Sequence, residues 1–201
     1  MIGGRSIEAV VEVSHPDAGA PWPTLPGAET FYVRLHAGVT DEEVGSIMLT
    51  ACLYNRVEVS RDAAETLSRF IAEDGFVLPG GPRLAAGGRE VVPGCCCGLE
   101  DWHEWLEVPR GKNTVWTGHD PSPEVEYVGD RVRVWQDRKS EGVGFVEFDR
   151  GEMEALLARV GSDLEGFLHR LGGWAEHLAP SLGQRVAEYF AEHMNIAPGR
   201  T

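Results

Sequence analysis

Three consecutive cysteines, Cys95, Cys96 and Cys97, are the side chains of this sequence best suited to chemistry. They precede a segment with helical character, and the amide groups at the start of a helix stabilise a thiolate. A thiolate is both a nucleophile and a soft metal ligand. The segment therefore has three interpretations: a reactive thiol, a metal site, or small side chains that fill the space beneath Trp102 and Trp105. Adjacent cysteines do not easily satisfy normal disulfide geometry, so we expect no disulfide framework.

Two histidines near these cysteines complete the candidate metal ligands. Zinc takes Cys and His ligands in a tetrahedral arrangement, commonly with two to four residues between paired cysteines. Here one residue separates Cys95 from Cys97, and the sequence has no second well-spaced pair. No sequence signature requires a cofactor. The metal-site hypothesis names zinc as the ion and, as its ligands, Cys95, Cys97, His103 and His119.

The loop 118–123 (GHDPSP) is the second candidate site. Its prolines restrict the backbone, and polar residues on a rigid loop are typical of binding sites, although an ordinary turn is the alternative. With Cys97 as a nucleophile, His119 would serve as the base and Asp120 would orient it. Aromatic side chains line ligand pockets and, more often, fill cores. The binding-site hypothesis comprises Trp102, Trp105, His119 and Asp120.

Signatures of the large enzyme classes are missing from the sequence. His103 and Glu107 resemble part of a zinc-protease helix, but that signature needs a second histidine where Glu107 stands. The glycine-rich run 79–82 lacks the Lys-Ser/Thr pair of a phosphate-binding loop. The sequence therefore predicts a non-enzymatic binding protein. The metal- or thiol-dependent site is the alternative function, and a small-molecule pocket walled by tryptophans, Trp116 among them, is a third.

The net charge of −14 limits the partners of the chain. An acidic surface repels nucleic-acid phosphates and anionic lipid, so we expect neither nucleic acid nor membrane as a partner. A basic protein is a partner compatible with this charge, and the alternative is that the charge serves only solubility. No apolar run approaches the roughly 20 residues that cross a bilayer, and the N-terminus lacks a basic stretch followed by an apolar core. These features predict a cytoplasmic protein.

The elements that would position these residues belong to an α+β fold. Alternating apolar residues flank Gly129–Asp130, which is the clearest hairpin signal in the chain. We expect an antiparallel sheet of Val125–Tyr127, Arg131–Trp135 and Val143–Phe148, covered by the C-terminal helices. We expect residues 1–201 to form a single domain, with the glycine-rich stretch 79–94 as the candidate boundary.

Helix-start signals mark most of the remaining elements. Thr40 followed by Glu43 forms a capping box, which predicts a helix over 41–55, and a buried strand over 47–54 is the alternative. The same type of signal at three later positions predicts three C-terminal helices, beginning at Asp149, Ser162 and Ser181. The other predicted elements are strands at 7–13 and 31–35, a helix from Ser60, a hairpin turn at Gly87–Gly88 and a short amphipathic helix over 99–108.

Two segments, Pro93–Trp102 (PGCCCGLEDW) and Gly118–Pro123 (GHDPSP), resemble segments of uncharacterised bacterial proteins. The C-terminal part of the chain, in which a hairpin ending at Trp135 is followed by a strand and helices, is loosely similar to bacterial toxin-immunity proteins. That second resemblance implies an acidic cytosolic protein that binds a toxin and has no catalysis of its own. It transfers no functional residue to this sequence.

Overall fold

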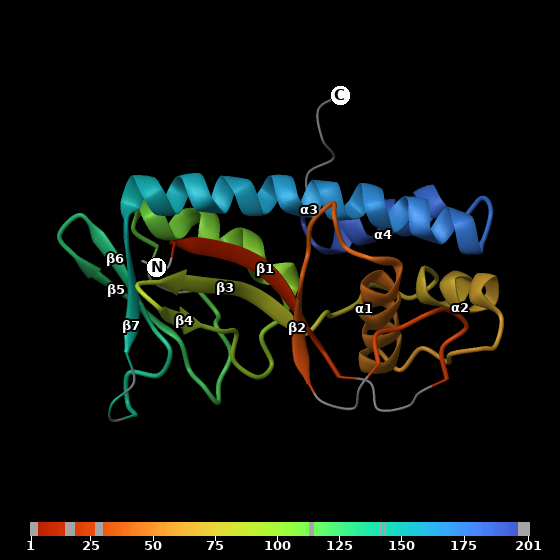
Figure 1. Ribbon diagram of the computed structural model, residues 1–201, viewed down its shortest axis with the longest axis horizontal. Coiled ribbons are helices and arrows are strands. Elements are labelled where there is room, and N and C mark those ends of the chain that lie inside the picture. The colour runs from red at the N-terminus through yellow and green to blue at the C-terminus, as the bar shows by residue number, and fades with distance from the viewer. Residues whose placement is uncertain are drawn as a thin grey trace. The chain divides into compact units, whose positions relative to one another are not determined.

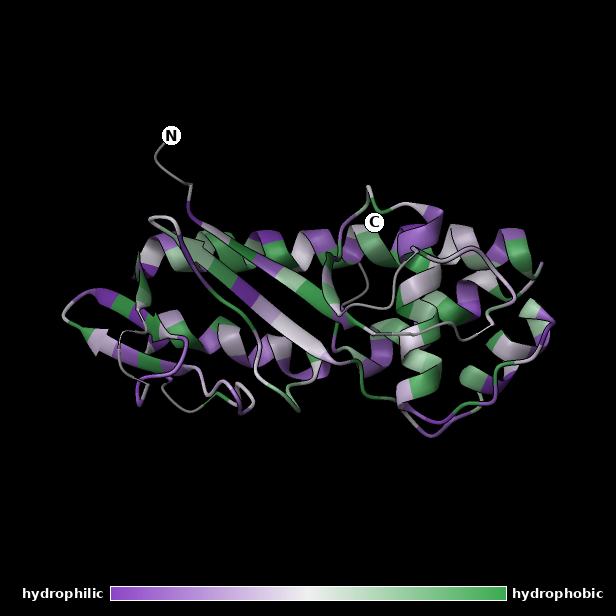
Figure 2. Cartoon of the chain, turned by 60° about the horizontal axis from the view of Figure 1, so that its bottom comes forward, coloured by the Kyte–Doolittle hydropathy of each residue, from purple (hydrophilic) through white to green (hydrophobic). Residues whose placement is uncertain are grey.

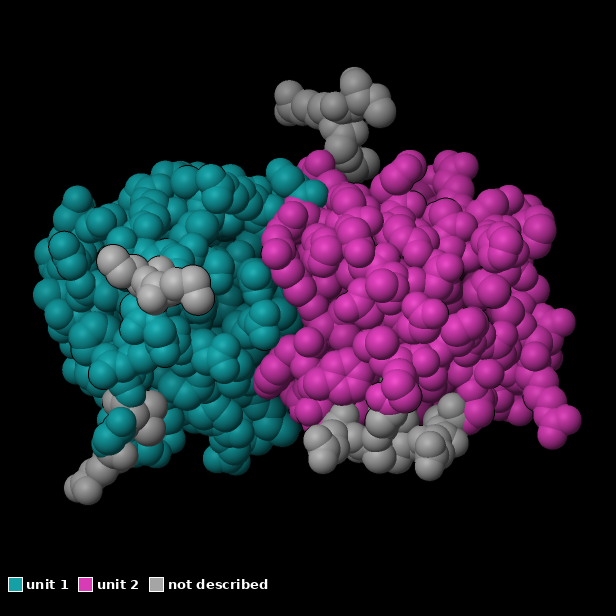
Figure 3. All heavy atoms as spheres, viewed as in Figure 1, with its two compact units in different colours: residues 1–10, 80–162 teal, residues 11–79, 163–201 magenta. Residues whose placement is uncertain are grey.

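The chain forms two compact units in the computed structural model (Figure 3), and each is described by itself. Unit 1 comprises residues 1–10 and 80–162, and unit 2 comprises residues 11–79 and 163–201. The structure describes residues 4–14, 19–26, 30–112, 115–140, 142 and 144–196. One strand and one long helix contribute residues to both units. That the whole chain is a single domain with a boundary near 79–94 stays a prediction.

The fold is α+β, as predicted, with antiparallel sheets and with helices at the C-terminal end of the chain (Figure 1). Hydrophobic and hydrophilic residues alternate along the strands and helices (Figure 2), which gives these elements a face for the core. No helix within the described part of the chain combines the length and apolar character needed to span a membrane. In chain order the elements are β1 (Ser6–Val13), β2 (Phe31–Arg34), α1 (Asp41–Tyr54), α2 (Ala63–Phe70), β3 (Gly80–Ala86), β4 (Arg89–Val91), η1 (Leu99–Arg110), β5 (Glu124–Val128), β6 (Arg131–Trp135), β7 (Phe145–Asp149), α3 (Arg150–Leu178) and α4 (Gly183–His193).

The strands form two sheets, one in the order β2-β1-β3-β4 and the other in the order β5-β6-β7. Both predicted hairpins are confirmed, because β3 pairs antiparallel with β4 and β5 pairs antiparallel with β6. Gly87, Gly88 and Gly129 have positive φ angles in these turns, a conformation that such two-residue loops require. β7 pairs with β6 from Phe145 onward. Val143, where this strand was predicted to begin, lies outside the described residues.

The helical element after the cysteines, η1, is a 3₁₀ helix in unit 1. Leu99, Trp102, Trp105 and Val108 are its buried side chains, apart from the proline near its end. They recur at every third position, which is the period of a 3₁₀ helix. The short amphipathic helix predicted over 99–108 is therefore confirmed as an element, and its 3₁₀ period places both Trp102 and Trp105 on the buried side. η1 packs against β3 and so fixes the end of the cysteine segment.

The helix α1 of unit 2 begins with the predicted capping box. The Thr40 hydroxyl accepts from the Glu43 N–H at 3.2 Å, and the Glu43 carboxylate accepts from the Thr40 N–H at 2.7 Å. The residues from Val44 to Cys52 are all buried. α2 begins later than the predicted Ser60, because Asp62 provides its N-cap by accepting from a backbone N–H at 2.9 Å.

The prediction of separate helices beginning at Asp149 and Ser162 is wrong. α3 is one helix of 29 residues, and Ser162 lies inside it. The Ser162 hydroxyl hydrogen-bonds the Ala158 carbonyl at 3.4 Å instead of capping a helix start. The apolar spacing continues unbroken across this position, so the cap signal has no helix terminus to act on.

The start of α4 also differs from its prediction. Ser181 was expected to cap this helix, but its backbone has a φ of 76° and the N-cap position is Leu182, without a side-chain hydrogen bond. Glu176 of α3 supplies the missing acceptor, because its carboxylate accepts from the N–H groups of Ser181 and Gly183, each at 3.1 Å. A carboxylate from a neighbouring helix thus satisfies the first amides of α4.

Candidate metal centre

An isolated β-bridge in unit 1 joins the cysteine segment to the histidine loop. The Cys95 N–H donates to the His119 carbonyl at 2.6 Å, and the His119 N–H donates to the Cys95 carbonyl at 3.0 Å. A further bond joins the Gly94 N–H to the Thr117 carbonyl at 3.0 Å. The whole of η1 lies between the two segments in the chain. The bridge therefore brings together two candidate sites whose proximity the sequence does not reveal.

Two glycines permit this close approach of two backbones. A Cβ atom on Gly118 would lie 2.6 Å from the Cys95 carbonyl oxygen, and one on Gly94 would lie 2.2 Å from the Pro121 carbonyl oxygen. Gly118 also has a φ of 84°, which residues with a side chain rarely adopt. The bridge consequently requires glycine at both positions.

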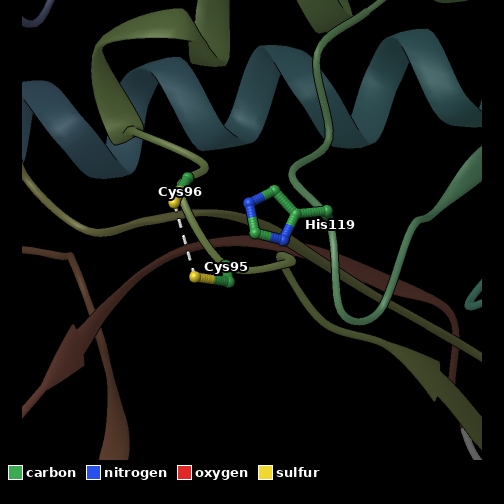
Figure 4. A group of neighbouring side chains, drawn as sticks. All are labelled: Cys95, Cys96 and His119. Carbon is green, nitrogen blue, oxygen red and sulfur yellow. Dashed lines mark hydrogen bonds between the residues drawn. The ribbon is translucent and has the colours of Figure 1, made fainter.

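Cys95, Cys96 and His119 form a group on the surface that can hold a metal ion (Figure 4). Their ligand atoms all lie within 4.8 Å of one another, and the three residues are exposed. The two sulfurs are 3.4 Å apart. Figure 4 shows the edge of the imidazole ring farthest from its backbone turned towards them. Among the residues that the structure describes, this is the group of three His, Cys, Asp or Glu side chains whose ligand atoms are close enough to share one ion.

The backbone of Cys96 explains why two neighbouring thiols lie on one side of the chain. Successive side chains of an extended strand point to opposite faces. Cys96 has a φ of 61°, in the left-handed region, and this interrupts the alternation. A residue with a side chain adopts that conformation at a cost of about 1–2 kcal/mol. Such backbone outliers concentrate at functional sites.

A carboxylate orients the imidazole of this group. The Nδ1 of His119 donates to the Oδ2 of Asp120 at 3.2 Å. This hydrogen bond assigns the proton to Nδ1 and leaves the Nε2 lone pair for a metal ion. Histidines that bind metals commonly donate their other ring nitrogen to a carboxylate in this way. The predicted pair His119 and Asp120 therefore lies together, and its arrangement suits metal binding.

Cys97 lies apart from this group, inside the core. Its side chain is 5% exposed, and its Sγ is 3.9 Å from the Trp116 carbonyl. Burial raises the pKa of this thiol to about 12, and the negative charges of Asp101 and Glu100 act in the same direction. A thiol that stays protonated is a poor nucleophile and a poor metal ligand. The cavity that Cys97 lines with Trp105 holds about 10 Å³, near the lower limit for one water molecule.

The other residues of the two site hypotheses are not members of this group. The Nδ1 of His103 is 3.0 Å from the Glu100 carbonyl, within η1. Trp102 and Trp105 are 5% and 3% exposed, so both are core residues. Of the predicted ligands, the structure thus brings together Cys95 and His119 and separates Cys97 and His103 from them.

Comparison with known protein families, with curated proteins and with solved structures finds no match. The resemblances to uncharacterised bacterial proteins and to toxin-immunity proteins therefore remain expectations from sequence. Functional conclusions for this chain depend on the geometry of its own side chains.

The predicted ligand set omitted Cys96, and Trp116 was named only as a wall of the third, small-molecule pocket. Cys96 was omitted because ligand spacing rules assume regular backbone between paired cysteines. Trp116, which is 51% exposed, donates its indole Nε1–H to the Cys96 carbonyl at 3.0 Å and so lies beside the thiols. The available signal was the pair of glycines, Gly94 and Gly98, that flank the cysteines, since glycines on both sides of a short polar run indicate an irregular backbone.

Proposed function

We propose that this protein binds a thiophilic metal ion, with zinc as the first choice, through Cys95, Cys96 and His119. The observation that supports the proposal is the closeness of three ligand atoms carried by two segments far apart in the chain. Two thiolates and one imidazole favour Zn²⁺ or Cu⁺ over Mg²⁺ and Ca²⁺, which prefer oxygen ligands. Net negative charge on the chain adds a general attraction for cations.

The distances within the group suit a tetrahedral ion. Two sulfurs that each lie about 2.3 Å from zinc at a tetrahedral angle are about 3.8 Å apart. The Cys95 and Cys96 sulfurs are 3.4 Å apart, and every pair of ligand atoms lies within 4.8 Å. These separations are compatible with three ligands of one ion, and the bridge holds the two backbone segments together.

The exposure of the group indicates an exchangeable site. Structural zinc sites are closed by four protein ligands, whereas sites with three protein ligands keep a fourth position for water or another ligand. Cys95, Cys96 and His119 supply three ligands, and all are exposed. An ion bound there would reach solvent directly, so a second molecule could supply its fourth ligand.

The proposal is tested by titrating the reduced, chelator-washed protein with Zn²⁺ in competition with a chromophoric chelator. We expect one ion per chain. Loss of an orienting partner weakens metal binding about 10–100-fold, so loss of a ligand in His119→Ala or Cys96→Ser should weaken it about 100-fold or more. His103→Ala is the matched control on η1 and should bind normally. Equal affinity in the wild type and His119→Ala would contradict the proposal.

A second candidate function is binding of a basic protein, and an apolar patch on unit 2 favours it. Leu53, Tyr54 and Val77 are 40%, 49% and 40% exposed. Asn55, which follows Leu53 and Tyr54 in the chain, links them to Val77. Its side chain donates to the Val77 carbonyl and accepts from the Val77 N–H, each at 2.8 Å. Unit 2 contains sixteen Asp and Glu against seven Arg. Exposed apolar groups within an acidic surface suit a basic partner.

This second function is tested by affinity capture with the immobilised wild type and with a double variant, Leu53→Ser with Val77→Ser. The expected result is a basic protein that the wild type retains, that the double variant loses, and whose retention falls with added salt. Val128→Ser, at an exposed valine of unit 1, is the matched control and should retain the partner. A partner held equally by the double variant would exclude this patch as its binding surface.

A further inference from the structure

The two sulfur ligands of the proposed metal site are also placed to react with each other. Cys95 and Cys96 are both exposed, neither is in a disulfide, and their sulfurs are 3.4 Å apart. A disulfide bond is about 2.04 Å long, so the two sulfurs must approach each other by somewhat more than 1 Å to form one, at the cost of strain in the ring that results. The third cysteine of the segment, Cys97, is buried, and its sulfur points to the Trp116 carbonyl.

We propose that Cys95 and Cys96 are a redox modification site. A hydroperoxide oxidises the pair to a disulfide between adjacent residues, a low-molecular-weight thiol reduces it again, and the disulfide form loses the metal ion. The release of the ion rests on the proposed function, whereas formation of the disulfide depends on the pair alone.

The oxidation proceeds in two balanced steps. One thiolate attacks the hydroperoxide, so that an S–O bond forms, the O–O bond breaks and the alcohol or water leaves with a proton; the product is a sulfenic acid. The second thiol attacks that sulfur, so that the S–S bond forms, the S–O bond breaks and water leaves. Two thiols lose two electrons and two protons in total, and the hydroperoxide is reduced. Both sulfurs then lack the thiolate lone pair that binds a metal ion.

The geometry of neighbouring residues makes this disulfide readily reversible. Adjacent Cα atoms are about 3.8 Å apart, below the 4.4–6.8 Å usual for disulfide-linked residues. The ring that contains the new bond is strained, and strained disulfides are more easily reduced. An external thiolate attacks one sulfur, a mixed disulfide forms, and a second thiol releases the reduced pair. The same pair can therefore alternate between a metal-binding and a disulfide form.

The test is differential alkylation of the full-length, reduced, metal-free chain after treatment with hydrogen peroxide. The protein is unfolded and alkylated with a light reagent, then reduced and alkylated with a heavy one, and fragmentation mass spectrometry assigns each label. We expect heavy label on Cys95 and Cys96 and light label on Cys52 and Cys97. Cys95→Ser, treated with a sulfenic-acid trap such as dimedone before it is unfolded, should carry no heavy label on Cys96, because the trapped sulfur has no second thiol with which to form a disulfide. Heavy label on Cys97, or sulfinic acid in place of heavy label at the pair, would overturn the proposal.

A parallel experiment with zinc-loaded protein separates this proposal from the proposed function. Peroxide should release zinc to a chromophoric indicator with the same time course as disulfide formation, and dithiothreitol should restore binding. If the reduced protein binds no zinc, the metal function fails, while heavy label on the pair still supports the redox site. If zinc binds and peroxide forms the disulfide without release of the ion, the proposed link between oxidation and release is overturned.

Discussion

The imidazole Nδ1 of His119 donates to the carboxylate Oδ2 of Asp120, its neighbour in the chain, at 3.2 Å. This contact directs the other ring nitrogen away from the carboxylate and leaves it as a lone-pair donor. The bridge to Cys95 holds the backbone of His119 at the same time. Orientation of the imidazole thus comes from the loop, and proximity to the sulfurs comes from the bridge.

Replacement of the orienting carboxylate tests that division of roles. Asp120→Asn should weaken zinc binding about 10–100-fold, because the amide is a poorer acceptor for the Nδ1 proton and the imidazole becomes a weaker ligand. Competition titration measures the change. Asp130→Asn, at the exposed turn between β5 and β6, is the matched control and should leave the affinity unchanged. An unchanged affinity in Asp120→Asn would show that the carboxylate does not support the ligand.

The backbone of Gly118 lies so close to that of Cys95 that we expect a side chain at position 118 to destabilise the fold. Gly118→Ala adds a Cβ atom 2.6 Å from the Cys95 carbonyl oxygen at a φ of 84°. We expect it to lower the free energy of unfolding by more than 2 kcal/mol and to weaken zinc binding. Gly129→Ala is the control, because it has a φ of 60° with no atom within 4 Å of its Cβ position, and should lose only about 1 kcal/mol. If urea unfolding shows the same loss of free energy in Gly118→Ala and Gly129→Ala, the close contact between Gly118 and Cys95 does not matter for stability.

The left-handed backbone of Cys96 predicts opposite effects on stability and binding. Cys96→Gly should raise the free energy of unfolding by about 1 kcal/mol, because glycine adopts a φ of 61° without a steric penalty. The same change removes a ligand and should abolish tight zinc binding. Cys95→Gly is the comparison, since Cys95 has no such backbone strain and its replacement should destabilise the fold. A loss of stability in Cys96→Gly would contradict the account of this residue as strained.

Alkaline pH should destabilise the fold through the buried thiol of Cys52. Burial raises the pKa of this thiol from 9.0 to about 12. The native state therefore keeps a proton that the unfolded chain loses, so the contribution to stability is complete below pH 9 and falls as the pH rises towards 12. Between pH 8 and pH 10, the wild type should lose about 1.4 kcal/mol more than Cys52→Ala in urea unfolding. Parallel losses in the two proteins would show that Cys52 ionises normally in the folded state.

The sequence predicts much of the local structure because local signals carry it. The capping box of Thr40 and the hairpin turn at Gly129 are each set by a few neighbouring residues, and both are confirmed. The cap predicted at Ser162 is wrong, because the apolar stripe of a long helix outweighs a local cap signal. Caps and turns are thus predictable from neighbouring residues where no longer apolar pattern favours a different structure.

The candidate site was predicted only in part because it depends on a contact between distant segments. His119 and Asp120 were singled out from a rigid loop, and they lie together. Their meeting with Cys95 depends on the fold of all the residues between them. Which of the three thiols is exposed depends on a backbone angle at Cys96 that composition and spacing do not encode. Sequence therefore identified the segment, and the fold selects the thiols.

The position of η1 between the two halves of the site has a consequence for unfolding. An ion held by Cys95, Cys96 and His119 would close a loop that contains this entire helix, and only the folded chain brings these three ligands together. Binding at a hundred times the dissociation constant adds about 2.7 kcal/mol to the free energy of unfolding. The midpoint of thermal unfolding should therefore rise with zinc concentration. Amide hydrogens of η1 should exchange with solvent more slowly when zinc is bound.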